Sequence, residues 1–239
     1  MKRSFHLAEH FLHRYSFQHL LVWLLLYIVA SPFLQSLPHA SMASSITMSL
    51  ILLLAVYAIN PRSRMYNYVL ILMALTLSLF WLNMLNIVSF SKKASGLIMI
   101  AYFSLLVYSF TRYVFSARKV DSRLISAALC LYLIMGTLWG VIYQVLEIFV
   151  PGSFKGDLLA QTSATGQSLQ HFEYFSFVTL TTLGYGDILP QTQGAASLCQ
   201  AEAIIGQFYM AVLVARLVGI QVSQKFSHQE NRQNDQDDK

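Results

Sequence analysis

The stretch of sequence that decides the fold is HFEYFSFVTLTTLGYGD, residues 171–187. It opens with an apolar run of 12 residues, which is too short to cross a bilayer as a helix. Longer apolar segments stand on either side of it, at 124–150 and 194–222. We therefore predict a short helix that enters the membrane and turns back, held between two helices that cross it.

Six apolar segments in all approach or exceed the roughly 20 residues that a membrane-spanning helix needs. Composition agrees with this class, because 56% of the residues are hydrophobic and 11% are charged, against about a quarter charged in soluble domains. A helix pairs every backbone amide within one segment, as hydrocarbon requires. The fold class is therefore an all-α membrane protein with six transmembrane helices plus a re-entrant helix and its loop. The six segments cover residues 18–37, 43–60, 66–90, 95–117, 124–150 and 194–222.

The positively charged residues predict the orientation of these helices. With the N-terminus in the cytoplasm, most loop Lys and Arg residues lie inside, and only Lys92, Lys93 and Lys155 lie outside. This asymmetry follows the positive-inside rule, although the Lys92-Lys93 pair is an exception to it. We predict a multi-pass protein of a cell membrane (plasma or inner membrane) with both termini cytoplasmic. The net charge of +5 reflects this topology, and we expect no nucleic-acid partner.

The loop Thr181–Asp187, TTLGYGD, resembles the selectivity filter of the potassium channel family, whose filter sequence is TVGYG; Leu183 takes the place of the valine. The resemblance covers roughly residues 124–222 and is weaker over the first four spans. It makes the re-entrant helix a pore helix and the loop a selectivity filter. It implies a homotetramer that conducts K⁺ passively and selectively among membrane lipids. K⁺ is then the permeant ion, with no cofactor and no enzymatic chemistry.

A filter of this kind is built from backbone oxygens, because a ring of carbonyls replaces the hydration shell of K⁺ without adding net charge. The oxygens come from Thr182, Leu183, Gly184, Tyr185 and Gly186, and these carbonyls are the only metal site that we predict. Aiming successive carbonyls at one axis requires backbone of alternating hand, which glycine adopts at little cost. We expect positive φ at both glycines, with the Leu183 and Tyr185 side chains pointing outward into packing.

Two residues are predicted to support the filter from outside. Asp187 resembles the aspartate that potassium channels anchor behind the filter by a hydrogen bond to the pore helix. Tyr174 stands where many relatives have a tryptophan donor, and its hydroxyl can donate instead; an interfacial aromatic residue is the alternative. We also expect Glu147, Asp157, Glu173 and Asp187 near the outer side, where carboxylates raise the local cation concentration.

The last span contains two further candidate residues. Glu202 is an ionisable residue inside a membrane segment, which is costly enough to suggest a function. It either steadies the filter from behind or responds to pH, and a protonated or hydrogen-bonded packing residue is the alternative. Gly206 matches the hinge glycine of channel inner helices by its position, with close helix packing as the alternative. A gate is then expected around Leu213 to Leu217.

The fourth span argues against a voltage sensor. Such a sensor needs positive charges repeated through the membrane, since each contributes only about 2.3 kcal/mol per 100 mV. Residues 95–111 contain no Arg or Lys, so we predict little voltage dependence. The gating stimulus is not indicated. His6, His10 and His13 share one face of an amphipathic helix, where they either sense cytoplasmic pH or are simply solvated.

These observations divide the chain into four parts. Two rival functions stay open: a weakly selective cation channel, because of Leu183 and the uncertain Tyr174 support, and a regulatory subunit that assembles with other channel chains. A potassium transporter fits less well, because such proteins usually combine several degenerate filter repeats in one chain. The predicted parts are a cytoplasmic amphipathic interfacial helix at 1–17, a four-helix peripheral transmembrane domain at 18–120, a pore domain (outer helix, pore helix, filter, inner helix) at 121–222, and a disordered cytoplasmic tail at 223–239.

Overall fold

The computed structural model describes the chain in seven stretches. The interfacial helix predicted for the first 17 residues, with its three histidines, lies outside them except for Phe17. The roles predicted for that segment therefore stay predictions. The described residues are 17–30, 33, 40–58, 64–84, 92–117, 119–162 and 168–237.

Each of the six predicted apolar segments contains a helix. Within the described residues, the helices at 93–116, 122–149 and 193–224 are long and apolar enough to cross a membrane, and three shorter apolar helices accompany them. The class of α-helical membrane protein is thus confirmed, while the six crossings stay a prediction. The helices are Phe17–Ala30, α2 (Ala40–Ala58), α3 (Arg64–Met84), α4 (Lys92–Ser116), α5 (Ser122–Phe149) and α8 (Gln193–Asp237).

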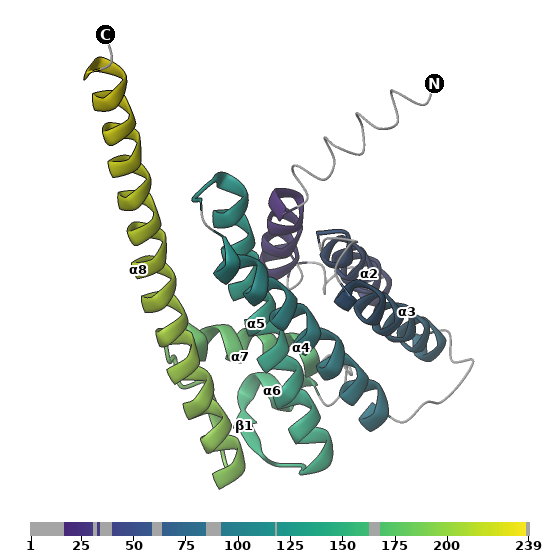
Figure 1. Ribbon diagram of the computed structural model, residues 1–239. Coiled ribbons are helices and arrows are strands. Elements are labelled where there is room, and N and C mark those ends of the chain that lie inside the picture. The colour runs from purple at the N-terminus through teal and green to yellow at the C-terminus, as the bar shows by residue number, and fades with distance from the viewer. Residues whose placement is uncertain are drawn as a thin grey trace, which may run out of the picture.

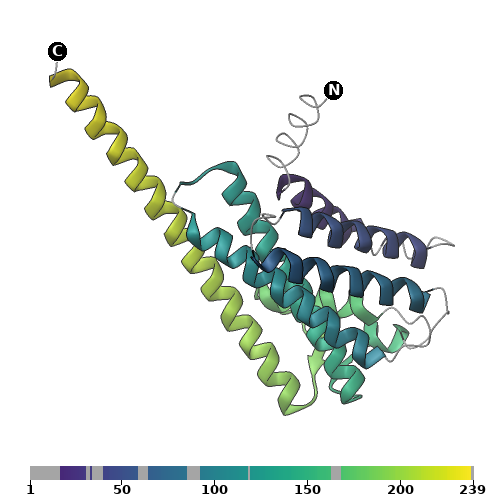
Figure 2. The ribbon, with the colours of Figure 1, turned by 45° about the vertical axis from the view of Figure 1, so that its right-hand side comes forward.

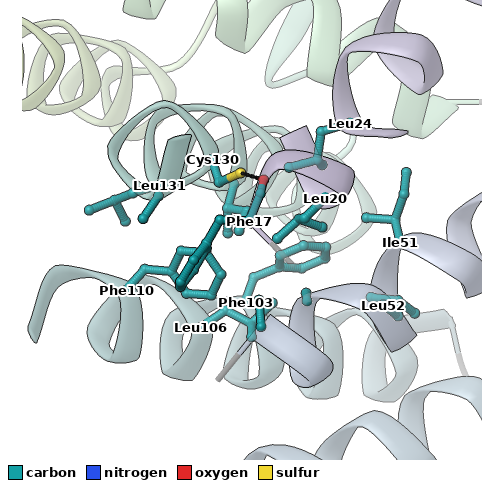
Figure 3. Close-up of a cluster of buried hydrophobic side chains, with 14 of the residues drawn as sticks. Phe17, Leu20, Leu24, Ile51, Leu52, Phe103, Leu106, Phe110, Cys130 and Leu131 are labelled. Carbon is teal, nitrogen blue, oxygen red and sulfur yellow. Dashed lines mark hydrogen bonds between the residues drawn. The ribbon is translucent and has the colours of Figure 1, made fainter. Parts of the chain in front are cut away.

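The centre of the fold is α5, against which α4 packs on one side (Figure 1). The first helix joins this layer through Phe17 and Leu20, which are buried beside Phe110 of α4 and Cys130 of α5 (Figure 3). The Phe17 and Phe110 rings meet edge to face with centroids 5.4 Å apart, a favoured aromatic geometry. The Cys130 thiol donates to the Phe17 carbonyl at 3.4 Å. The peripheral helices therefore share one apolar core with α5.

One of the two lysines predicted to lie outside, against the positive-inside rule, has a contact in the structure. The Lys93 ammonium lies 4.9 Å from the centroid of the Phe149 ring, within the range of a cation–π interaction. Lys93 lies in the first turn of α4, and Phe149 ends α5. The contact therefore joins the ends of two antiparallel helices.

The segment between α5 and α8 is more structured than the exposed loop predicted for residues 151–169. It forms β1 (Phe154–Gly156), α6 (Asp157–Thr162), α7 (Ser168–Leu180) and β2 (Ile188–Pro190). The strands pair antiparallel, with Lys155 opposite Leu189. The loop prediction failed because Phe154 is buried under α7, which fixes the strand that carries it. The short helix α7 lies between α5 and α8 (Figure 1).

The disordered tail predicted for 223–239 is wrong as far as Asp237, because α8 continues as one helix to that residue. Figure 2 shows this end of α8 extending well beyond the other helices. Residues 220–237 contain no Gly or Pro and many Gln, Glu, Lys and Arg residues, which are good helix formers. Extending an existing helix avoids the cost of nucleation. The polar composition of this segment was therefore not enough to end α8.

Candidate functional site

The loop after α7 has a backbone of alternating hand. Thr182, Gly184 and Gly186 have φ of 58°, 60° and 77°, while Leu183 and Tyr185 between them do not have positive φ. The positive φ predicted for the two glycines is confirmed, and Thr182 adds a third residue that the sequence did not predict. Positive φ is uncommon outside glycine, so Thr182 marks a backbone held by its surroundings. Alternation of this kind lets successive carbonyls face one side.

Hydrogen bonds to the end of α7 hold the start of this loop. The Val178 carbonyl accepts from the amides of Leu183 at 2.9 Å and Gly184 at 3.3 Å. The Thr182 amide donates to the Thr179 carbonyl at 3.0 Å. The chain therefore turns back at the C-terminal end of α7, where the helix dipole places partial negative charge.

The outer end of the loop is tied to α7 through Asp187. The Tyr174 hydroxyl donates to one carboxylate oxygen of Asp187 at 2.7 Å. The other oxygen accepts from the Ile188 amide at 3.1 Å. A tyrosine hydroxyl keeps its proton at neutral pH and so remains a donor, which is the geometry that the sequence suggested for this pair.

The loop is open to solvent within one chain. Leu183 is 54% exposed and Tyr185 is 67% exposed, so the packing predicted for these side chains is not supplied by their own chain and stays a prediction. A β-carbon placed on Gly184 or Gly186 would meet nothing within 4 Å. The glycines are therefore required by their backbone angles and not by lack of space in one chain.

An aromatic cluster supports α7 from behind. The Phe154 ring of β1 meets Phe172 and Phe175 of α7 with centroids 5.3 and 5.6 Å apart. Tyr143 of α5 meets Phe154 and Phe175, each at 5.3 Å. Ile188 of β2 is buried in the same cluster. The strand that follows the loop is therefore fixed to the same rings as α7.

A buried polar cluster joins α5, α7 and α8 at Glu202. The carboxyl is fully buried, accepts a hydrogen bond from the Tyr143 hydroxyl, and lies within hydrogen-bond distance of the Ser176 hydroxyl. Ser176 also lies 2.7 Å from the Gly136 carbonyl. The sequence predicted a role for Glu202 but not for Tyr143 or Ser176. A small polar residue inside an apolar helix was the one available signal for Ser176.

We had predicted Glu173 near the outer side with the other acidic residues, but it is not an exposed carboxylate. It is buried, and its carboxyl accepts a hydrogen bond from Tyr27 of the first helix at 3.1 Å. The close approach of α7 to Gly140 explains the burial, since a β-carbon there would lie 2.8 Å from the Glu173 α-carbon. Glu147 has a structural partner too: it accepts from the Gly152 and Phe154 amides at 2.7 and 3.1 Å.

Residues 127–222 match the sequence profile of a family described as "Ion channel". The region runs from α5 through α7 and the loop into α8. A virus protein, the Potassium channel protein kcv of Paramecium bursaria Chlorella virus 1, is 31% identical over 70 residues, which are 29% of this chain and 73% of the viral protein. This chain belongs to the ion channel family. It is therefore a channel protein and not an enzyme. No solved structure matches it.

Gly206 of the channel lies where α8 packs closely on the end of α7. A β-carbon at this position would lie 2.8 Å from the Leu180 carbonyl oxygen. The same carbonyl is 3.3 Å from the Tyr132 hydroxyl of α5, which donates to it. Close helix packing, the alternative weighed for Gly206, therefore has a contact in the structure. The hinge stays a prediction.

The two leucines at the ends of the gate expected around Leu213 to Leu217 pack within their own chain, whereas Val214 between them is 53% exposed on the open side of the channel's α8; the gate stays a prediction. Leu213 is 6% exposed, and Leu217 packs against the same apolar core. Both side chains therefore face helices of their own chain. The expectation rested on distance along the helix, which does not specify a face.

Arg216 ties α8 of the channel to the end of α4, a contact that the sequence did not suggest. Its guanidinium donates to the Phe115 and Ala117 carbonyls at 2.6 and 3.0 Å and lies over the Phe115 ring. Carbonyls at a helix C-terminus lack donors within the helix, and Arg216 provides donors for these two. Beyond this level α8 continues to Asp237, about 30 Å further at 1.5 Å per residue.

Proposed function

We propose that this chain is one of four identical subunits of a potassium-selective channel in a cell membrane. The observation that carries the proposal is the alternating backbone from Thr182 to Gly186, held at both ends yet exposed along its length. In this proposal the carbonyls of those five residues replace the water around K⁺. The Thr182 hydroxyl adds oxygen at the inner end. The resemblance to a viral potassium channel supports the choice of ion.

The open side of α8 supports four copies. One loop cannot encircle an ion, and rotational symmetry is the usual way in which identical chains complete such a ring. Neighbouring copies are proposed to cover part of this apolar face, and membrane lipids the remainder. Its exposed hydrophobic residues are Ile204, Ile205, Phe208, Met210, Val212, Val214, Val218 and Val222.

The peripheral helices are proposed to complete a six-span subunit with both termini in the cytoplasm. Phe17–Ala30 and α2 to α4 would form the peripheral domain, and α5 to α8 the pore domain. We also propose little voltage dependence, since residues 95–111 of α4 carry no Arg or Lys. Asp187, Tyr174 and Glu202 are proposed to support the filter, and Gly206 to act as a hinge.

Uptake of radioactive cations into liposomes that contain the purified protein tests this function. We expect Rb⁺, which resembles K⁺, to enter far faster than Na⁺ or Li⁺ under a potassium gradient. Equal uptake of Rb⁺ and Na⁺ would instead favour a weakly selective cation channel, the alternative raised by Leu183. No uptake of any cation by the protein alone would favour a regulatory subunit.

A further inference from the structure

The polar cluster behind the pore helix is closed to water. Tyr143, Ser176 and Glu202 are each fully buried in a single chain. They come from α5, α7 and α8, so the cluster joins the three helices around the filter. Buried polar groups in proteins are almost always hydrogen-bonded. These three lie against one another and the Gly136 carbonyl, and the Tyr143 hydroxyl also lies beside the Cys199 thiol.

The hydrogens in this cluster can be counted. Ser176 Oγ is within hydrogen-bond distance of the Gly136 carbonyl and of Glu202 Oε1, while the Tyr143 hydroxyl donates to Glu202 Oε2. A serine hydroxyl carries one hydrogen but accepts at two lone pairs, and an ionised carboxylate only accepts. If Glu202 were ionised, one of the two oxygens beside Ser176 would face its hydroxyl without a hydrogen between them.

We propose that Glu202 is a neutral carboxylic acid that donates its own proton to Ser176 Oγ. Ser176 then donates to the Gly136 carbonyl, and Tyr143 donates to Glu202 Oε2. Three hydrogens now serve three short contacts, and every group is satisfied. Glu202 is thus a positioning residue that holds the pore helix against α5 and α8. The hydrogen-bond assignment stands on the geometry, and only its effect on the filter rests on the proposed function.

Removal of this proton is expected to loosen the pore helix. An ionised Glu202 would place a charge in a site without water, which is costly unless that charge is paired. The titratable groups that face it are Tyr143 and Tyr132 of α5 and Cys199 of α8. Glu173 lies three residues before Ser176 on α7 but bonds to Tyr27. These groups are neutral or, for the thiol and phenols, become anions at high pH, so none supplies a compensating positive charge. Alkaline pH therefore weakens the cluster.

Infrared spectroscopy of the purified protein tests the proposal without any need for conduction. At neutral pH we expect a carbonyl band of a protonated carboxylic acid that loses intensity in Glu202→Gln. Measuring both proteins in a Glu173→Gln background removes the contribution of Glu173, which is also buried. The matched control is Glu147→Gln, because Glu147 accepts from two backbone amides outside the cluster, and its replacement should leave the band unchanged. If Glu202→Gln leaves the protonated-acid band unchanged, the proposal is overturned.

A second variant keeps the test decisive if Glu202→Gln fails to fold. Ser176→Ala removes the acceptor of the Glu202 proton, so the acid band should shift to higher frequency as its O–H loses a partner. A band that does not move contradicts the proposed donor. The thermal midpoint of the wild-type protein should also fall between neutral and alkaline pH, and that fall should be smaller in Glu202→Gln. Non-selective cation uptake would contradict the proposed function but would not change the infrared and thermal results.

Discussion

The outer helix α5 and the last helix α8 have almost equal hydropathy but very different surroundings. In the most apolar part of α5, 61% of the residues are buried within the chain, against 17% in α8. Helix α5 is covered by α4 on one side and by α7 on another. Helix α8 touches its own chain along one side only. Equal apolarity with unequal burial shows that most of the α8 surface is left to be covered from outside the single chain, as is most of α4, which is 22% buried; for α8 we propose that neighbouring copies cover part of it and lipids the rest.

The pore helix shows the same difference on its two sides. Toward α5 and β1, its residues Phe172, Phe175 and Ser176 are buried among aromatic and polar partners. Toward the open side, the loop from Thr181 to Asp187 is exposed at every residue. One side is therefore complete within the chain, and the other is proposed to be completed by neighbouring copies.

The largest expected effect is on the open side, at Gly184. Replacement by alanine forces an L-residue to keep a φ of 60°, which costs about 1–3 kcal/mol in each copy or rotates the carbonyl away from the ion path. We expect Rb⁺ uptake into liposomes to fall on the order of 100-fold, since every copy in the ring carries the strain.

The matched control is Gly194→Ala. Gly194 lies in the first turn of α8, has no positive φ, and would also meet nothing within 4 Å as alanine. Its uptake should stay near the wild-type rate. If both alanine variants conduct equally well, the backbone of the loop is not the ion path.

The next effect separates the two helices directly. Leu131→Ala removes a buried side chain of α5 and should lower the free energy of unfolding by about 2–5 kcal/mol. Phe208→Ala removes an exposed side chain of α8 and should instead shift the equilibrium between assembled and single chains. Thermal unfolding and native mass on dilution in detergent measure the two effects. Leu129→Ala, at an exposed position of α5, should change neither much. A Phe208→Ala variant that assembles like wild type would contradict the proposal that neighbouring copies contact this side of α8.

A smaller effect is expected where the two sides meet at Tyr174. Tyr174→Phe removes the hydrogen bond to Asp187, a contribution of about 1.5–3 kcal/mol for a bond to a charged group. We predict that the ratio of Na⁺ to Rb⁺ uptake rises, because the outer end of the loop is less firmly held. Tyr68→Phe, at an exposed residue of α3, provides the control. Unchanged ion ratios in Tyr174→Phe would show that this bond does not support selectivity.

The smallest effect is expected in the periphery, at Arg112 of α4. Its guanidinium lies 6.0 Å from the Tyr108 ring centroid at the end of the helix. Since no positive charge lies deeper at 95–111, Arg112→Gln should leave the voltage dependence of the current unchanged. Recordings from planar bilayers measure it. A steep wild-type curve that flattens in Arg112→Gln would show that α4 carries gating charge.

The loop and its flanking helices were predictable because their signals are local. Apolar length predicts where a helix crosses, and the two glycines predict where the backbone reverses hand. The bond from Tyr174 to Asp187 was also within reach, since both residues were candidates by position.

Faces and partners were not predictable from one sequence. Glu173 and Glu202 are both carboxyl groups beside apolar residues, and nothing in the chain shows that each finds a tyrosine on another helix. Gly140 of α5 lets α7 approach closely at Glu173, but in the sequence it is simply a glycine within an apolar segment. Leu213 was assigned to a gate by its distance from the loop, whereas its burial is set by the direction in which α8 turns it.

The central claim is that several copies share one filter, and mixed assemblies test it most directly. Wild-type chains and Gly184→Ala chains would be co-expressed in equal amounts, purified together and placed in liposomes. If four copies form each filter, Rb⁺ uptake should fall well below half of the wild-type value, down to about one sixteenth if a single defective copy is enough to block the filter. A fall to only about half would mean that each chain conducts independently, and that result would contradict the account.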